Sequence, residues 1–520
     1  MASAAQINTQ QRSKPSPVPA PVGGLNGRDG LSEMPPTDAY EMDNLFPGTT
    51  GVIARNGCEP HQTSIATPIR SLECFSGGDT ADKILAFSGA NIYDASIKNV
   101  MAILKTGMVS DKVIATMFGT VADKAQWLII TTGADVPKSY NGTVITDLAI
   151  TGIPEGPQNI NYVCAFKGRL YFAVNGRLGF YFLAPGTIQG AAQWFDLAQV
   201  SALGGTLRAI GTYSQDSGDG PNDYIIFVTS KGEYFMYGGY DPSDVNAFEI
   251  VGRYRSSEPI GRKCLCDYSN DLLCLTVEGA IQFSAIKRYG DTRSEITAIT
   301  AKLGDRLLKR NNFQDVYGWC MKTYPVGGWL IVSVPNTTSE AGSFDHFVMN
   351  TITQAWCRFT SDEWNGVCFT VANRKLYFGR YDGKIMLADT VQSDNAKEIR
   401  FVCKQAYNMF NYPGNKHFQW AAVMCASEAP VLISGTLNVD FKDFTPPATP
   451  LPLAVGQGAV WDQTFWDQEY WAQGLYAQEV MITLHNYGTW GSFHLQGNVK
   501  GATFQWYSTK FIVEAAEGLL

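Results

Sequence analysis

Charged residues are scarce in this sequence, and no long apolar run occurs in it. Asp, Glu, Lys and Arg make up 17% of the 520 residues, with 48 acids against 40 bases and a formal net charge of −8. This balance lacks the basic excess with which proteins grip nucleic-acid phosphates. No apolar stretch approaches the roughly 18 residues of a membrane-spanning helix, and the first residues lack the apolar core of a secretory signal. We therefore expect no tight DNA binding, no membrane span and no secretion signal.

Motifs of metal-binding and catalytic sites are also missing. The five histidines form no HxH or HExxH pair, and the eleven cysteines form no CxxC pair. There is no Gly-rich phosphate loop of Walker type and no GxSxG elbow. The sequence therefore predicts no metal, no cofactor, no catalytic residues and no enzyme activity. We expect the cysteines to be free, buried thiols in a reducing compartment.

Glycine and aromatic residues, in contrast, are abundant. The chain has 51 Gly, and aromatic residues account for 12% of it. Such a composition is typical of many short strands that are separated by turns and have broad faces to cover. The sequence predicts an all-β fold.

One phrase occurs twice in the chain, about two hundred residues apart. "NRKLYFGRYDGKIMLAD" (373–389) echoes "FKGRLYFAVNGRLGFYFLA" (166–184), and similar windows repeat roughly every 45 residues. Each window has a short strand, a polar turn, a strongly apolar strand, a Gly turn and a third strand. The windows begin near Ser71, Ala115, Asn161, Ala209, Gly261, Tyr317 and Trp364. The Gly turns are Ser88-Gly89, Asn175-Gly176, Lys231-Gly232, Glu278-Gly279 and Asp382-Gly383.

This period predicts a β-propeller of six to eight blades over residues 71–390. A β-sandwich or a solenoid with coincidental spacing is the alternative. Residues 295–313, "EITAITAKLGDRLLKRNNF", have apolar residues near helical spacing and predict a helix inserted between blades. Residues 391–520 have longer alternating strands and predict a separate C-terminal β-rich domain. Within it, Trp461, Trp466 and Trp471 indicate either a docking surface or internal packing.

Two segments precede the repeats. Residues 1–20 predict a disordered N-terminal tail, and residues 21–70 form a distinct segment. Within that segment Thr37 and Asp38 are typical of a helix start, so a short helix presenting Ala39, Met42 and Leu45 is expected to end at Pro47-Gly48.

The best candidate for a site is the acidic stretch "SQDSGDGPND", residues 214–223. Asp216, Asp219 and Asp223 crowd one loop, which starts like the Asp-box of sialidases. The closing Thr-Trp of that box is absent, and the spacing does not match an EF-hand. A solvated acidic hairpin explains the stretch better than calcium binding or acid catalysis.

The segment that follows Pro21 resembles the start of the tail nozzle family of short-tailed bacteriophages, the tail tubular protein B-like proteins. That family combines a Pro-x-Gly-Gly-Leu-Asn-x-Arg-Asp phrase, an Asp-Asn-x-Phe-Pro phrase and an Arg-x-Gly. The close of the chain, "FQWYSTKFIVEAAEGLL", is also similar to that family's end. The matching residues are Pro21, Gly23, Gly24, Leu25, Asn26, Arg28 and Asp29, then Asp43, Asn44, Phe46 and Pro47, then Arg55 and Gly57.

The resemblance implies a structural protein of the virion tail, assembled in the host cytoplasm as a homo-hexameric ring. Such a nozzle would continue the DNA channel below the portal and the adaptor, contact the adaptor and the tail fibres, and take part in DNA retention and ejection. The DNA would pass through the lumen without specific binding. A tail-tip propeller hydrolase or lectin acting on host glycans is the alternative, and a scaffold propeller of the WD40 type lacks its Gly-His and Trp-Asp signatures.

Overall fold

The structure is a computed structural model that describes residues 14–515, apart from 79–80, 121–125, 217–220, 290–297, 309–313, 315, 340, 429 and 454–475. Strands make up 55% and helices 3%, so the predicted all-β class is confirmed. The chain forms two compact units. Unit 1 consists of Met1–Gly57, Met349–Ser361 and Val391–Leu520, and unit 2 of Cys58–Val348 and Asp362–Thr390.

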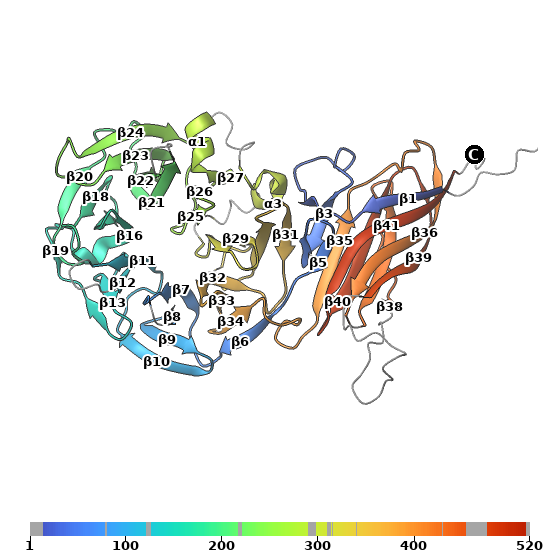
Figure 1. The fold of residues 1–520 in the computed structure, drawn as a ribbon, viewed down its shortest axis with the longest axis horizontal. Helices are drawn as coiled ribbons and strands as arrows, with labels where there is room; N and C mark the ends of the chain where they lie inside the picture. Colours follow the sequence, from blue (N-terminus) through green and yellow to red (C-terminus); the bar gives the residue numbers. More distant parts are fainter. Residues whose placement is uncertain are drawn as a thin grey trace, which may run out of the picture. The chain divides into compact units, whose positions relative to one another are not determined.

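Unit 2 is a succession of small sheets that lie around a ring (Figure 1). Six sheets of three or four strands follow one another along its described residues, and between the fifth and the sixth lie three strands, within residues 320–350, that belong to a ten-stranded sheet. The first strand of each small sheet lies toward the middle of the ring. This is the organisation of a β-propeller. The first four sheets contain β7 (Ile69–Phe75), β8 (Lys83–Ser88), β9 (Asn91–Ile97) and β10 (Val100–Thr106); β11 (Ile114–Gly119), β12 (Gln126–Thr131), β13 (Lys138–Tyr140) and β14 (Ile145–Asp147); β16 (Ile160–Phe166), β17 (Arg169–Val174), β18 (Gly179–Phe182) and β20 (Gln193–Asp196); and β21 (Leu207–Asp216), β22 (Pro221–Thr229), β23 (Glu233–Gly239) and β24 (Phe248–Arg255).

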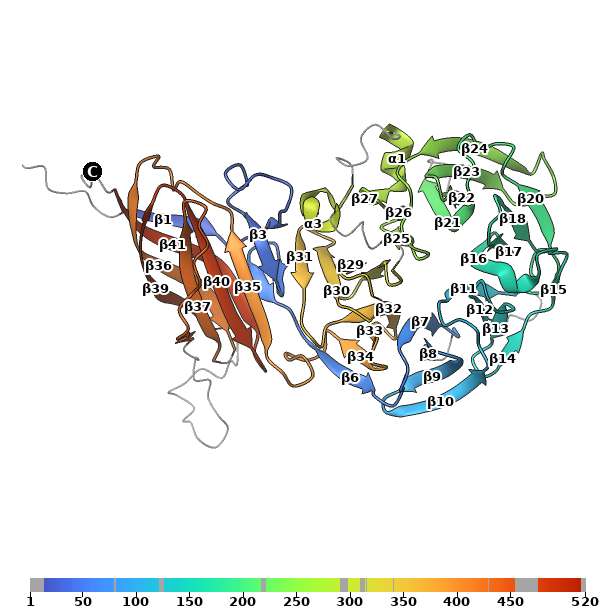
Figure 2. The same ribbon diagram turned by 180° about the vertical axis from the view of Figure 1, so that it is seen from behind.

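The last sheet of unit 2 is completed by a strand from the start of the unit. β6 (Cys58–Gln62) pairs antiparallel with β34, so that Cys58 lies opposite Ala388 (Figure 2). This pairing joins the two ends of the unit and gives the last sheet four strands. The remaining strands are β25 (Leu265–Tyr268), β26 (Asp271–Thr276) and β27 (Gly279–Gln282); β28 (Cys320–Tyr324), β29 (Trp329–Pro335) and β30 (Phe344–Asn350); and β32 (Gly366–Ala372), β33 (Lys375–Arg380) and β34 (Ile385–Ala388). β15 (Ile150–Thr151) and β19 (Gly190–Ala191) form a separate short parallel pair.

The predicted repeat windows coincide with these sheets. Each window begins inside the first strand of a sheet or just ahead of it, and the strongly apolar run is the buried second strand, as in β17 and β29. The five predicted Gly turns are confirmed, because Gly89, Gly176, Gly232, Gly279 and Gly383 all have positive φ. A side chain at those positions would be strained, which explains why the turns contain glycine.

The predicted inserted helix is wrong as a single element. Its described part contains a 3-10 turn, η3 (Ala301–Leu303), and a short helix, α3 (Asp305–Leu308), with Gly304 between them at φ 48. The rest of residues 295–313 lies largely outside the described residues. The clearest helix, α1 (Phe283–Tyr289), directly follows β27, and Phe283 and Ile286 are its buried residues. This helix lies outside the predicted range of residues 295–313.

Unit 1 consists of two β-sheets that face each other. Phe493 lies against Trp506 and Phe511, with ring centroids 6.0 and 5.6 Å away, and these three side chains come from strands of both sheets. One sheet has the order β39-β36-β41-β5-β4, with β1 also beside β41. The other is the ten-stranded sheet, whose strands in unit 1 run β31-β3-β35-β40-β37-β38, with β2 beside β3. The strands are β1 (Lys14–Pro19), β2 (Gly24–Leu25), β3 (Asp38–Asp43), β4 (Leu45–Pro47), β5 (Val52–Ala54), β31 (Trp356–Phe359), β35 (Ile399–Gln405), β36 (Lys416–Ser427), β37 (Leu432–Val439), β38 (Leu451–Pro452), β39 (Tyr476–Gly488), β40 (Gly491–Val499) and β41 (Phe504–Ala515).

Two local expectations for the N-terminal part need correction. The helix predicted to start at Thr37 and Asp38 is wrong, because β3 is a strand that pairs antiparallel with β35. The preference of Thr37 and Asp38 for a helix start is a local effect. Pairing with β35 buries Ala39 and Met42, and this burial decides in favour of a strand. The sequence predicts a disordered tail over residues 1–20, but Lys14–Pro19 form β1 against β41, and residues 1–13 lie outside the described residues. Proline's fixed φ is compatible with an edge strand.

A buried polar network joins the three separate segments of unit 1. Arg55 and Asp394 form a bidentate ion pair, with Nη2–Oδ2 and Nη1–Oδ1 distances of 2.6 and 2.9 Å, and their side chains are 0% and 1% exposed. Arg55 Nε also donates to Asn44 Oδ1 at 2.7 Å. Asn44, at φ 57, donates through Nδ2 to the backbone carbonyls of Thr360 and Arg400, both at 2.7 Å. Each of the three segments therefore contributes to one network.

Other residues of the nozzle-like signature make close contacts in the same region. A Cβ on Gly57 would lie 1.9 Å from the backbone carbonyl oxygen of Ser393, so only glycine fits there. Asp43 pairs with Arg358 through two contacts of 2.6 and 2.8 Å. These signature residues hold unit 1 together.

We expect Arg55→Met to lower the free energy of unfolding of unit 1 by about 3–5 kcal/mol, because it leaves the buried Asp394 carboxylate without its cation. Urea unfolding followed by tryptophan fluorescence measures the loss. Arg28→Met is the matched control: Arg28 pairs with Asp29 at 2.8 Å, but the two side chains are 52% and 27% exposed, so the loss should stay within about 1 kcal/mol. Equal losses in the two variants would contradict this account of the network.

Candidate functional site

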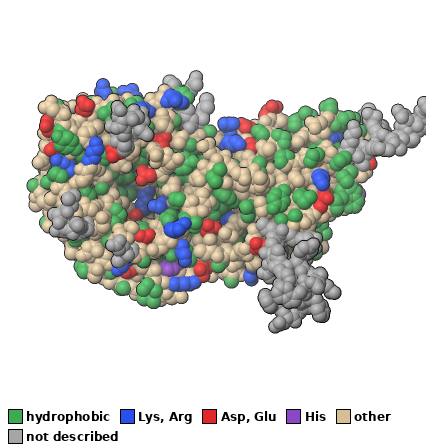
Figure 3. All heavy atoms as spheres, in the orientation of Figure 1, with side chains coloured by type: hydrophobic (Ala, Val, Ile, Leu, Met, Phe, Trp, Pro, Cys, Tyr) green, Lys and Arg blue, Asp and Glu red, His purple; other side chains and the backbone are tan. Residues whose placement is uncertain are grey.

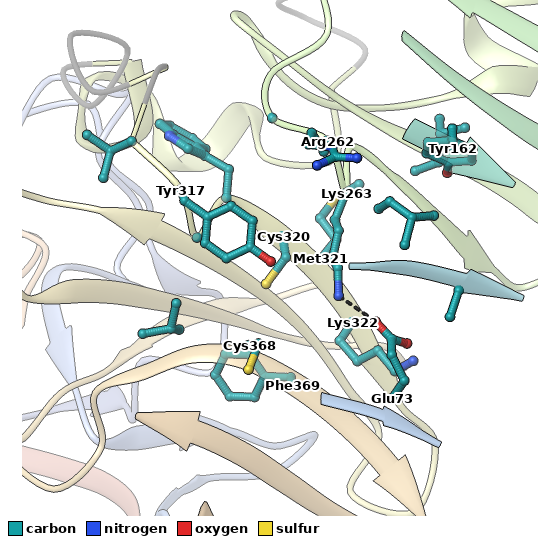
Figure 4. A pocket seen from close by; sticks show the side chains of 18 residues that line it. Glu73, Tyr162, Arg262, Lys263, Tyr317, Cys320, Met321, Lys322, Cys368 and Phe369 are labelled. Atoms are coloured by element: carbon teal, nitrogen blue, oxygen red, sulfur yellow. Dashed lines mark hydrogen bonds and ion pairs between the residues drawn. The ribbon is translucent and has the colours of Figure 1, made fainter. Parts of the chain in front are cut away.

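The innermost strands of unit 2 surround a pocket of about 190 Å³ (Figure 4). Side chains from β7, β11, β16, β28 and β32 line it, together with the loop that precedes β25. On the face shown in Figure 3, Lys and Arg side chains gather near the middle of the ring of sheets, where the surface is hollowed. Among the lining residues are Glu73, Tyr162, Arg262, Lys263, Tyr317 and Lys322.

Arg262 reaches from the loop before β25 to backbone groups of two other sheets. Its Nη1 donates to the carbonyls of Thr132 at 2.8 Å and Lys112 at 3.3 Å, and its Nη2 donates to the carbonyl of Asn161 at 2.6 Å. Burial lowers the pKa of Arg262, but a guanidinium keeps its charge in a protein at any ordinary pH. The charge is therefore held by three carbonyl dipoles.

Lys263, the next residue, forms an ion pair with Glu73 of β7. The Nζ–Oε1 distance is 2.7 Å, and the two side chains are 23% and 20% exposed. Burial on its own lowers the pKa of Lys263, but the Glu73 carboxylate and Tyr317 raise it, and the net shift is upward. The ion pair links the lead-in to β25 with the first sheet of the unit.

Tyr317 completes the cluster by a chain of hydrogen bonds to the first two sheets. Its hydroxyl donates to the Arg70 carbonyl at 2.9 Å and lies 2.9 Å from Ser71 Oγ, which in turn accepts from the Val113 amide at 2.9 Å. Lys112 Nζ lies 5.0 Å from the centre of the tyrosine ring. Burial raises the pKa of Tyr317 to about 12, so the hydroxyl is neutral and donates at physiological pH.

The cluster of Arg262, Lys263, Glu73 and Tyr317, here called the central plug, connects sheets that are not adjacent in sequence. The nearby thiols are not activated, because burial raises the pKa of Cys320 to about 11 and that of Cys368 to about 12. A thiol that stays protonated is a poor nucleophile and a poor metal ligand. The arrangement is suited to holding the inner strands together.

The acidic candidate stretch lies at the β21–β22 hairpin. Ser214 and Asp223 are opposite each other in the ladder, and the Ser214 hydroxyl donates to the exposed Asp223 carboxylate at 2.5 Å. Asp216 ends β21, and Asp219 lies outside the described residues. Trp461, Trp466 and Trp471 also lie outside them. The described part of the chain contains no group of three or more His, Cys, Asp or Glu placed to hold a metal ion.

Sequence analysis did not identify the central plug. The repeat pattern comes closest to it, because two of the predicted windows begin at Gly261 and Tyr317. Arg262 and Lys263 directly follow Gly261. Sequence spacing also missed His417 and His485, whose rings are stacked with centroids 6.2 Å apart on neighbouring strands. All eleven cysteines are free thiols, and eight of them are buried. No described helix has the length and apolar character needed to cross a membrane.

Comparisons with known proteins yield similarity to solved structures only. No family model and no curated protein matches the chain. Among solved structures, BBS1N in complex with ARL6DN is 12% identical with a TM-score of 0.40, over 66% of this chain and 99% of that one. A streptogramin B lyase is 12% identical with a TM-score of 0.40, over 64% and 96%. YCF48 bound to a D1 peptide is 10% identical with a TM-score of 0.37, over 64% and 96%. Likenesses this weak carry no inference about function.

We expect Arg262→Met to lower the free energy of unfolding of unit 2 by at least about 3 kcal/mol, since three carbonyls lose a charged donor. Arg253→Met is the matched control, because Arg253 makes one exposed contact, to the Val200 carbonyl at 3.2 Å. Its loss should remain within about 1 kcal/mol. Urea unfolding of both variants against the parent protein measures the difference, and a loss for Arg262→Met no larger than that of the control would contradict a structural role for the central plug.

Unit 2 should lose stability in alkali. Burial raises the pKa values of Cys320 and Cys368 in the folded protein to about 11 and about 12. The contribution of the two neutral thiols to the free energy of unfolding is therefore complete below the pKa of an unfolded thiol, near 9, and declines as the pH rises above that value. For these two buried thiols the loss by pH 10 is roughly 3 kcal/mol. Unfolding at pH 8 and pH 10 measures it. The Cys320→Ala and Cys368→Ala double variant should show a smaller loss, and an unchanged loss would contradict the assignment.

Proposed function

We propose that this protein is a structural subunit of the tail of a short-tailed bacteriophage, the nozzle that continues the DNA channel below the portal and the adaptor. The observation that carries the proposal is the N-terminal signature, whose three phrases occur in the order found in that family. The structural use of its residues supports it, because Asn44, Arg55 and Gly57 bind segments from distant parts of the chain. In this proposal the protein takes part in DNA retention and ejection.

We further propose a seven-bladed propeller, with one blade for each of the six small sheets and one formed by β28, β29 and β30, closed by β6. Beside the central plug the inner strands leave hollows of about 190 and 360 Å³, and each is too small for a nucleic-acid duplex. DNA would therefore pass between subunits and not through a propeller. A channel between subunits requires several copies around it, and this supports a ring. A head-to-tail contact that is repeated from copy to copy forms a closed ring when the rotation between neighbours divides a full turn evenly. The number six comes from the resemblance.

The low content of basic residues is compatible with a channel through which DNA moves. Each phosphate contact to a Lys or Arg adds salt-sensitive affinity that a moving DNA molecule must break again. A chain with a net charge of −8 and 17% charged residues offers few such contacts. The partners in this proposal are five further copies, the adaptor protein and the tail fibres, and the location is the virion tail.

Deleting the gene tests the proposal. Particles without the protein should lack the distal tail and fail to retain DNA, as electron microscopy and DNA-release assays would show. Complementation with the wild-type protein should restore both properties. Complementation with the Asp216→Ala and Asp219→Ala double variant should restore them equally well, since those acids have no part in a nozzle.

A different result would point to the alternative. If particles without the protein kept an intact tail channel and lost only adsorption, the protein would be a receptor-binding appendage. If, in addition, the Asp216→Ala and Asp219→Ala variant abolished cleavage of a host glycan by the purified protein, a tail-tip hydrolase would replace the nozzle proposal.

A further inference from the structure

The pocket of about 190 Å³ in unit 2, here called the central pocket, has an excess of positive charge. Its described lining contains three basic side chains, those of Arg262, Lys263 and Lys322, and one acidic side chain, that of Glu73. Glu73 is already bound in the ion pair with Lys263 at 2.7 Å. Three bases and one acid give this lining a formal charge of +2.

A further guanidinium, that of Arg208 in β21, lies next to the central pocket. Arg208 Nε donates to the carbonyl of Gly261 at 3.0 Å, and Gly261 belongs to the pocket lining. Burial lowers the pKa of Arg262 most, and the positive charge of Arg208 lowers it further. The two arginines are therefore close enough to repel each other, and both side chains are half-buried.

The partners that the described residues give to both guanidiniums are backbone carbonyls. Arg262 donates to three of them and Arg208 to one. A carbonyl oxygen satisfies an N–H donor and stabilises the cation through its dipole, but it leaves the net charge unchanged. An anion in the central pocket would be attracted by both arginines and would reduce their mutual repulsion.

The central pocket also has the room and the access for a small oxyanion. One water molecule needs roughly 10–15 Å³ of such space, so about 190 Å³ holds a phosphate ion and several water molecules. Tyr162 is part of the lining, and burial raises its pKa, so its hydroxyl stays protonated and can donate. In Figure 3 the middle of the ring of sheets is hollowed from outside, where the Lys and Arg side chains gather.

We propose that the central pocket binds a phosphate group, which Arg262 and Arg208 hold through their guanidiniums. A phosphate group carries a charge of about −1.5 to −2 at pH 7, which matches the formal charge of the lining, whereas a monocarboxylate carries half as much. Guanidinium groups bind phosphate oxygens through paired N–H···O bonds. The ligand is the free phosphate ion or the phosphate end of a small phosphorylated molecule.

This inference is independent of the proposed nozzle function. It concerns residues of unit 2 alone, and it is tested on the purified chain without a virion. A protein that binds phosphate and has no part in a tail, or a nozzle whose central pocket binds nothing, would each contradict one proposal and leave the other intact.

Titration calorimetry of the full-length protein with inorganic phosphate, at constant ionic strength, provides the test. The expected result is one phosphate bound per chain. The Arg208→Gln variant should bind it roughly tenfold more weakly, because one charged donor is lost. Glutamine keeps an N–H group that can donate to the Gly261 carbonyl, so urea unfolding without phosphate should match the parent protein.

Arg253→Gln is the matched control for the charge. Arg253 lies in β24 of the same sheet and donates to the Val200 carbonyl at 3.2 Å on an exposed surface. The substitution removes the same charge away from the central pocket, so this variant should bind phosphate like the parent. A loss equal to that of Arg208→Gln would show a general charge effect and would overturn the assignment to the pocket.

Two further ligands define the chemistry. Acetate should bind at least tenfold more weakly than phosphate, and equal binding would overturn the preference for a dianion. Glycerol 3-phosphate separates the two sources of the phosphate group. Tighter binding of this ester than of inorganic phosphate supports a site for a phosphorylated molecule, and weaker binding supports a site for the free ion.

The Asp315→Asn variant tests whether the chain supplies its own anion. Asp315 directly precedes Val316 of the pocket lining and lies outside the described residues. Phosphate affinity should not change in this variant. A gain of tenfold or more would mean that the chain's own carboxylate occupies the site, and it would overturn the inference. So would a parent protein that binds no phosphate at millimolar concentration, or an Arg208→Gln variant that binds phosphate as tightly as the parent.

Discussion

The pairing of Arg55 with Asp394 is the constraint on which unit 1 depends. The two side chains are almost completely buried, and 339 residues separate them in sequence. A buried guanidinium is tolerated only with its carboxylate and with its remaining donors satisfied, and Asn44 satisfies one of them. The same Asn44 holds the carbonyls of Thr360 and Arg400, so one ion pair fixes the relative positions of three segments. In the sequence, all of unit 2 lies between Arg55 and Asp394.

The repeat in the sequence predicted much of unit 2, because the signals for its sheets are local. An apolar run followed by a glycine turn such as Lys231-Gly232 marks a buried strand and a hairpin, and both depend on neighbouring residues alone. Local signals failed where distant partners decide the structure. Asp38 has the chemistry of a helix cap, yet pairing with β35 makes its segment a strand. β6 lies ahead of the first repeat window, and its partner β34 is more than 300 residues away in the sequence. Its place in the last sheet therefore could not be predicted from the repeat pattern.

The central plug illustrates the same limit for a site. Arg262 is bound by carbonyls of Lys112, Thr132 and Asn161, and backbone carbonyls leave no trace in an amino-acid sequence. Glu73 lies 190 residues from its partner Lys263, and every repeat offers comparable charges. The nozzle-like signature was recognisable because its residues are consecutive phrases, whereas the reason for them, contacts with residues near 358 and 394, appears only in the structure.

The closing strand β6 also sets an order for synthesis. Cys58 meets Ala388 in the ladder, and Arg55 meets Asp394 only six residues later in the chain. During translation at about 5–20 residues per second, the first 57 residues and β6 leave the ribosome tens of seconds before their partners exist. Unit 2 can close once Ala388 emerges, whereas unit 1 still needs its strands from β35 to β41. A ribosome that stalls anywhere in between would release a chain in which neither unit is closed.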